Sequence, residues 1–142
     1  MGVKRLHVNL AFVQCLSPDF VDMVIAVTER YHVDPGLITF EITKPLTRNE
    51  FATLDGVMKR LKEKGFTFAM EDFGSGYANV ESIFELNFDL VKIDRSLLWN
   101  AAKSEEGEII LGNSIRIIKD LRRKALVEDR KKTCPRADLL KR

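Results

Sequence analysis

The chain has 142 residues, of which 45% are hydrophobic and 31% charged, and this composition is typical of a soluble globular domain with one core. No apolar run reaches the roughly 18 residues of a membrane-spanning helix, and the N-terminus lacks the apolar stretch of a signal peptide, so we expect a cytoplasmic protein. The net charge of +2 is unevenly spread. The residues from Arg116 onward hold 11 Lys or Arg against 4 Asp or Glu, whereas those before it hold 12 against 17.

Strand-like and helix-like segments alternate along the chain. Short apolar or β-branched runs predict strands, and apolar residues repeated every three or four positions predict helices. In chain order, the predicted strands are Leu6–Leu10, Ile38–Thr43, Phe66–Met70, Leu90–Ile93 and Ala125–Val127. The predicted helices are Asp19–Tyr31, Asn49–Lys64, Asn79–Leu86, Glu105–Leu121 and Ala137–Lys141.

Two local signals mark helix boundaries. Ser17 followed by Pro18 predicts the start of the first helix, with a cap and then proline at the first helical position. Gly65 predicts the end of the second helix, because glycine is favoured directly after a helix C-terminus.

The alternation of strands and helices predicts an α/β fold with a mainly parallel sheet. The repeat of roughly 25–35 residues suits a (β/α) barrel, yet a complete barrel has eight units in about 250 residues. This chain provides four to five such strand–helix units. We therefore predict one domain over residues 1–142 with a partial TIM-like barrel, whose remaining strands come from a parent protein or a second chain.

A polar residue stands at or near the carboxyl end of every predicted strand. Catalytic groups of parallel barrels gather at that rim, and a charge buried there is costly unless it is paired or bound to a metal. Carboxylate and amide oxygens suit Mg²⁺ or Mn²⁺, and two such ions can clamp a phosphodiester and activate water. Isolated salt bridges and loop caps are the alternative explanation. The residues are Asn9, Glu41, Glu71 with Asp72, Lys92 and Glu128.

The cysteines and histidines form no metal-binding pattern. Cys15 and Cys134 are far apart, and so are His7 and His32. We expect free thiols and a metal site built from oxygen ligands.

Four segments, in order and with matching spacing, resemble successive signatures of the EAL domain family. The resemblance covers residues 1–124. It implies a TIM-like barrel that hydrolyses cyclic di-GMP to the linear dinucleotide with Mg²⁺ or Mn²⁺. The segments are Val8-Asn9-Leu10, Phe40-Glu41-Ile42-Thr43, Glu71-Asp72-Phe73-Gly74-Ser75-Gly76-Tyr77 and Val91-Lys92-Ile93-Asp94-Arg95-Ser96.

The resemblance also implies roles for individual residues. Asn9 and Glu41 fall on metal ligands of the family, and Glu71 and Asp72 fall on its paired aspartates. Lys92 falls on the lysine that orients the attacking water and offsets phosphate charge, and Glu128 on a later catalytic glutamate. The glycine-rich segment after Asp72 resembles a flexible loop of the family that takes part in dimer contacts and metal binding. This segment includes Gly74, Ser75, Gly76 and Tyr77.

The sequence also departs from the family pattern. The Glu-Ala-Leu motif is absent, Lys44 stands where the family has a glutamate, and Glu71 replaces an aspartate. Residues 125–142 form a divergent basic tail, in which 129–136 match nothing in the family. We therefore expect a domain truncated at both ends that is weak or inactive as an isolated chain.

Other functions remain open at this point. One is a degenerate module that binds cyclic di-GMP or a protein without catalysis and acts through dimerisation. Another is an open half-barrel whose sheet edges pair with a second copy. Nucleic-acid binding by the basic tail is the least favoured alternative, because its charges are not interleaved with aromatic residues.

Overall fold

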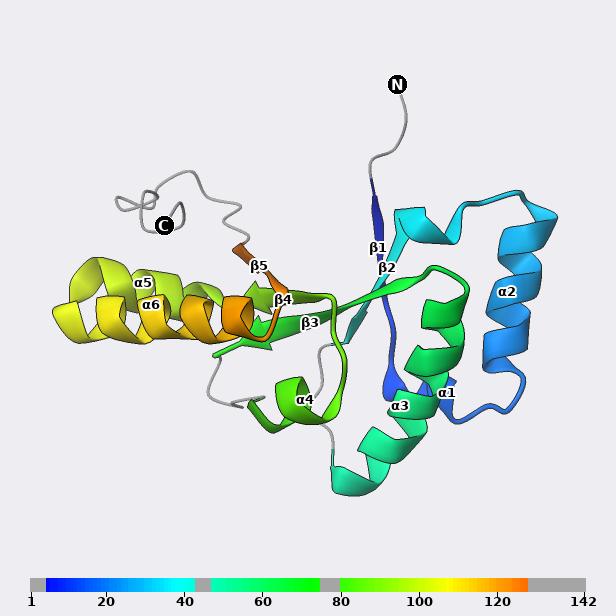
Figure 1. Cartoon of the computed structure of the whole chain (residues 1–142), viewed down its shortest axis with the longest axis horizontal. Helices are drawn as coiled ribbons and strands as arrows, with labels where there is room; N and C mark the ends of the chain where they lie inside the picture. The colour runs from blue at the N-terminus through cyan, green and yellow to red at the C-terminus, as the bar shows by residue number, and fades with distance from the viewer. Residues whose placement is uncertain (1–4, 43–46, 75–79, 128–142) are drawn as a thin grey trace. The chain divides into compact units, whose positions relative to one another are not determined.

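The computed structural model describes residues 5–42, 47–74 and 80–127. It divides into two compact units, Met1–Met70 with Val80–Asp89, and Glu71–Asn79 with Leu90–Arg142. The elements, drawn in Figure 1, are β1 (Leu6–Asn9), α1 (Phe12–Cys15), α2 (Phe20–Arg30), the 3-10 helix η1 (Pro35–Leu37), β2 (Ile38–Ile42), α3 (Arg48–Glu63), β3 (Thr67–Phe73), α4 (Val80–Glu85), β4 (Leu90–Ile93), α5 (Arg95–Lys103), α6 (Glu105–Asp120) and β5 (Lys124–Val127).

The five described strands form one sheet in the order β1-β2-β3-β4-β5. The pairs β1–β2, β2–β3 and β4–β5 are parallel. The prediction of an α/β fold with four to five strand–helix units and a mainly parallel sheet is therefore confirmed. Because the strands of each of these three parallel pairs are consecutive in the chain, a crossover containing a helix connects them, which is the arrangement of a partial (β/α) barrel.

The core of the first unit lies between α3 and the strands β2 and β3. The buried face of α3 carries Leu54, Met58 and Leu61, each no more than 1% exposed. The rings of Phe66 and Phe68 are also buried. Each of them packs against the Phe40 ring on β2, with centroids 5.5 and 5.6 Å apart. Large apolar side chains thus hold this unit together.

The second unit is built on a close pair of helices. Figure 1 shows α5 and α6 side by side, and α5 and α6 meet at a glycine. A Cβ on Gly107 would lie 2.1 Å from the carbonyl oxygen of Asn100, so no other residue fits there without moving a helix. The α6 helix starts at this point with the Ser104 side chain accepting a hydrogen bond from the Gly107 amide.

Three helices end with the same turn. After α3, the amides of Gly65 and Phe66 donate to the carbonyls of Lys62 and Leu61, a Schellman motif in which Gly65 has a φ of 104°. The predicted role of Gly65 is confirmed. The equivalent positions after α2 and α6 are His32 (φ 53°) and Arg122 (φ 60°), which are side-chain-bearing residues in a left-handed conformation.

Several predicted boundaries are wrong. Pro18 lies in a turn before α2, which begins at Phe20, because the Phe20 amide bonds to the carbonyl of Ser17 and closes that turn first. The third strand runs through Phe73, so Glu71 and Asp72 lie within it. Helix α5 was not predicted, and the predicted helix 137–141 lies outside the described residues.

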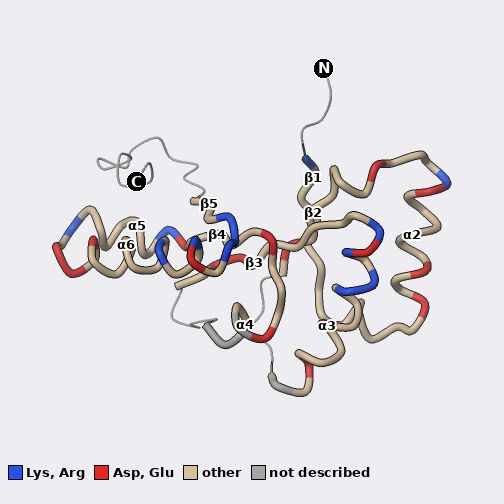
Figure 2. Tube along the Cα trace, in the orientation of Figure 1, with Lys and Arg blue, Asp and Glu red and all other residues tan. Residues whose placement is uncertain are grey.

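The charge of α6 follows its helix dipole. Its first turn carries Glu105, Glu106 and Glu108, and its last turn carries Lys119. Basic residues gather where α6 leads into β5 (Figure 2). Acidic residues at the start of α6 and a basic residue at its end both interact favourably with the helix dipole. None of the helices in the parts of the chain that the structure describes has the length and apolar character to cross a membrane.

Candidate functional site

In the first unit, Asn9 and Glu41 lie beside each other at the carboxyl ends of β1 and β2. They are register partners, and the Leu10 amide donates to the Glu41 carbonyl at 2.9 Å. Since side chains of paired residues share a face of the sheet, the Asn9 amide and the Glu41 carboxylate project on the same side. Glu41 is only 6% exposed although it is ionisable.

His7 contacts the same carboxylate. Its Nδ1 lies 2.5 Å from Oε1 of Glu41. Sequence reasoning missed this contact, because the two residues are 34 positions apart. The available signal was that His7 stands two residues before Asn9 on a strand, which places both on one face.

A polar layer lies below Glu41 on the same face of the sheet. Thr39, which is fully buried, and Thr67 join β2 to β3 through hydroxyl groups 2.6 Å apart. The Thr67 hydroxyl also lies 3.3 Å from the Ile38 carbonyl. These bonds satisfy the buried hydroxyls, so the strand that carries Glu41 is fixed below its functional end.

In the second unit, Lys92 and Glu71 face each other. Lys92, the penultimate residue of β4, is 6% exposed. Its Nζ lies 3.5 Å from Oε1 of Glu71 on β3, whose side chain is half-buried. Next to them the Asp94 amide donates to the Phe73 carbonyl at 2.9 Å, which joins the carboxyl ends of the two strands. The buried ammonium therefore has a nearby carboxylate.

Asp72 near the end of β3 and Gly74 directly after it both have a positive φ. Asp72 is exposed and has a φ of 55°, a conformation that aspartate tolerates better than most residues. Gly74 has a φ of 93°, and a Cβ there would lie 2.4 Å from Cδ1 of Leu97. Glycine is thus required at position 74 by both backbone and space.

The described residues place the predicted site residues in two groups. The first unit holds Asn9 and Glu41, and the second holds Glu71, Asp72, Lys92 and Gly74. Ser75, Gly76, Tyr77 and Glu128 lie outside the described residues, and so does Lys44.

The donor chemistry of both groups fits a hard divalent cation. The first group offers an amide oxygen and a carboxylate, and the second offers two carboxylates. Among the described residues, no three His, Cys, Asp or Glu side chains form a metal-binding group by themselves. A thiolate ligand is disfavoured at Cys15, because burial raises the pKa of its thiol to about 11.

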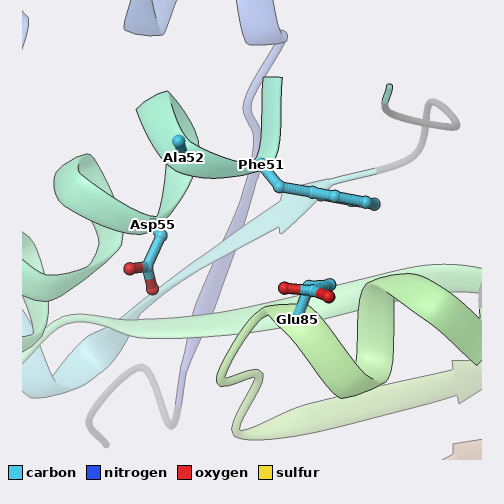
Figure 3. Close-up of a pocket in the computed structure, with 4 residues that line it drawn as sticks. All are labelled: Phe51, Ala52, Asp55 and Glu85. Carbon is cyan, nitrogen blue, oxygen red and sulfur yellow. The ribbon is translucent and has the colours of Figure 1, made fainter. Parts of the chain in front are cut away.

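A separate hollow of about 360 Å³ lies between α3 and α4 in the first unit. Figure 3 shows Phe51 and Asp55 projecting from α3 above Glu85 of α4, with Ala52 behind them. Asp55 already forms an ion pair with Lys59 at 2.8 Å. The hydrogen bond to Asp55 also raises the pKa of Lys59. None of the described lining residues is a strand-end polar residue, so this hollow is not part of the candidate site.

Comparison with known proteins gives a consistent result. The family model described as "EAL domain" matches residues 1–129. A protein of Escherichia coli K12 named "Probable cyclic di-GMP phosphodiesterase PdeA" is 33% identical over 90 residues, which are 63% of this chain and 12% of that protein. A cyclic di-GMP phosphodiesterase of Pseudomonas aeruginosa is 24% identical over 106 residues, 75% of this chain and 18% of that protein. The chain thus spans under a fifth of either relative.

Solved structures show the same fold. The EAL domain of Mycobacterium smegmatis DcpA superposes with a TM-score of 0.85 at 23% identity, covering 96% of this chain and 61% of that one. Klebsiella pneumoniae BlrP1, in a complex with manganese and cyclic di-GMP, superposes with a TM-score of 0.80 at 24% identity, covering 92% of this chain and 33% of that one.

Proposed function

This chain belongs to the EAL domain family, and from that membership we propose that its strand ends bind cyclic di-GMP with Mg²⁺ or Mn²⁺ and support hydrolysis of one phosphodiester bond. The product is the linear dinucleotide. The relatives named as cyclic di-GMP phosphodiesterases support the substrate, and the manganese complex of BlrP1 supports a divalent cation.

One observation carries the proposal. Glu41 and Lys92 are charged side chains, each 6% exposed and each the penultimate residue of a parallel strand. Burying a charge is unfavourable unless partners compensate for it, and a well-packed apolar residue would stabilise such a position at least as well. Their presence at the strand ends is therefore best explained by function.

We assign the metal-binding role to Asn9, Glu41, Glu71 and Asp72, whose oxygen atoms match the preference of Mg²⁺ and Mn²⁺. Asn9 with Glu41 in the first unit, and Glu71 with Asp72 in the second, would each hold a cation whose positive charge would polarise the phosphodiester. Gly74, Ser75, Gly76 and Tyr77 form the proposed loop beside the substrate.

Lys92 and Glu128 carry the proposed catalytic roles. The Lys92 ammonium is a fixed positive charge for the phosphate oxygens, on which negative charge grows in the transition state, and it orients the attacking water. Glu128 is assigned as a further acidic group of the reaction on the family resemblance.

A second candidate function follows from the contact between Lys92 and Glu71. Glu71 is one methylene longer than the aspartate of the family, and its carboxylate lies 3.5 Å from the lysine. An ammonium neutralised in this way offers less charge to a phosphate. A receptor that binds cyclic di-GMP without turnover, and acts through dimerisation, is the resulting alternative.

The test is incubation of cyclic di-GMP with the purified 142-residue chain and Mn²⁺ or Mg²⁺, with the linear dinucleotide measured by chromatography. We expect slow hydrolysis that Glu41→Gln reduces by about 10²–10³-fold, the cost of losing one electrostatic group from an active site. Glu85→Gln is the matched control, because Glu85 is an exposed glutamate of the same unit that lines the hollow between α3 and α4.

Each result selects one function. Hydrolysis lost in Glu41→Gln and retained in Glu85→Gln supports the phosphodiesterase. Binding of cyclic di-GMP with no linear product supports the receptor. A chain that neither binds nor cleaves the nucleotide with either metal would contradict both.

A further inference from the structure

His7 contacts a proposed metal ligand but has no role in the resemblance or in the proposed function. Its Nδ1 lies 2.5 Å from Oε1 of Glu41. When Glu41 is ionised, its carboxylate can only accept hydrogen bonds, so Nδ1 carries the hydrogen and donates it. The contact is therefore a charge-assisted hydrogen bond to one named oxygen of Glu41.

The surroundings of this hydrogen bond exclude most water. The Glu41 side chain is 8% exposed and that of His7 is 29% exposed, so both partners are largely shielded from water. Little water competes for Oε1, and a hydrogen bond that is shielded from water is electrostatically stronger than an exposed one. The rotation of the Glu41 carboxylate is thereby restricted.

We infer that His7 is a positioning residue, which holds the Glu41 carboxylate in the orientation that binds the divalent cation. The inference rests on the proposed function. Donors that orient a ligating carboxylate in this way affect metal affinity about 10–100-fold when removed. His7 itself provides no ligand atom in this account, and Asn9, its neighbour on the same face, keeps the role of ligand.

Two substitutions separate the hydrogen bond from the bulk of the ring. Nδ1 of histidine and Nδ2 of asparagine are the same number of bonds from Cα, so His7→Asn keeps a donor near Oε1. His7→Leu keeps a side chain of moderate size but removes the hydrogen-bond donor. His32→Asn is the matched control, because His32 is exposed and its positive φ suits asparagine.

The experiment is a titration of each metal-free chain with Mn²⁺, in which electron paramagnetic resonance reports the free ion. We expect His7→Leu to weaken binding about 10–100-fold, and His7→Asn and His32→Asn to stay within about threefold of the wild type. Thermal unfolding without metal establishes that each variant is folded. Unchanged binding in His7→Leu, or an equal loss in His7→Asn, would overturn the inference.

A second measurement needs no variant. Nitrogen-15 NMR of the metal-free wild-type chain is expected to show a hydrogen on Nδ1 of His7, and a ring with its hydrogen on Nε2 alone would contradict the geometry. The two proposals fail separately. A wild-type chain that binds no Mn²⁺ contradicts the proposed function and this inference, whereas metal binding that is indifferent to His7→Leu contradicts this inference alone.

Discussion

The two units each bury one charged side chain at the penultimate residue of a strand, but they compensate for its charge differently. In the first unit, Glu41 is 2.5 Å from an imidazole nitrogen. In the second, Lys92 is 3.5 Å from a carboxylate oxygen of Glu71. The short contact restricts the direction of the Glu41 carboxylate, whereas the longer contact holds the Lys92 ammonium less tightly. Under the proposed function, this difference suits Glu41 to binding the cation and Lys92 to contacting the phosphate.

The packing that supports the two charged residues differs as well. The first unit relies on large buried side chains of α3 and on aromatic rings of β2 and β3 that contact each other. The second relies on a close approach of two helix backbones at Gly107. A substitution that shortens a buried side chain should therefore destabilise the first unit. A substitution that enlarges the residue at the helix contact should destabilise the second.

Leu61→Ala is expected to have the largest effect. Leu61 is completely buried, and truncating such a residue leaves a cavity that lowers the free energy of unfolding by about 2–5 kcal/mol. Leu16→Ala is the control, because Leu16 belongs to the same unit but is 58% exposed. Urea unfolding measures both, and an equal loss in the two variants would refute the packing account of the first unit.

Gly107→Ala should lower the free energy of unfolding by about 1–3 kcal/mol, since the added methyl group meets the Asn100 carbonyl. Gly112→Ala lies in the same helix with nothing within 4 Å of its Cβ, and should raise stability by about 0.5–1 kcal/mol. Chemical denaturation measures the change in the free energy of unfolding of each variant, including its sign. Two changes of the same sign would mean that α5 and α6 are not in close contact.

The smallest effect tests a feature that the units share. His32 and Arg122 both hold the left-handed position that ends a helix, α2 in the first unit and α6 in the second. Replacing either with glycine removes the backbone strain, and we expect a gain of about 0.5–1 kcal/mol for each. Differential scanning calorimetry measures it. A loss at one position would show that its side chain contributes more than the strain costs.

The elements predicted best are those with a strong apolar pattern. The strands at Ile38, Leu90 and Ala125 and the helices α3 and α6 were placed within one or two residues, since their apolar residues follow the spacing expected of a strand or a helix. Helix α5 was missed although its signal is local: the Asp94 side chain accepts from the Ser96 amide and caps the helix directly after β4. That aspartate was interpreted only as part of a motif.

The candidate site was predictable in part for the same reason. Asn9, Glu41 and Lys92 were proposed as site residues because each stands at or near the end of a predicted strand, which the sequence alone shows. The contact between His7 and Glu41 depends on the register of two strands, which brings together residues 34 positions apart. Register is set by packing of the whole sheet, so a single sequence does not reveal which side chains meet.

The most direct test of the central claim is equilibrium binding of cyclic di-GMP to the wild-type chain and to Lys92→Met, with and without Mn²⁺. Lys62→Met is the control, because Lys62 also pairs with a carboxylate, that of Asp89 at 3.3 Å, but lies on α3. We predict metal-dependent binding that weakens at least about tenfold in Lys92→Met, the effect of one lost charge-assisted contact, and is unchanged in Lys62→Met. Binding that needs no metal and is as tight in Lys92→Met as in the wild type would contradict the assignment of the buried strand-end charges to cyclic di-GMP.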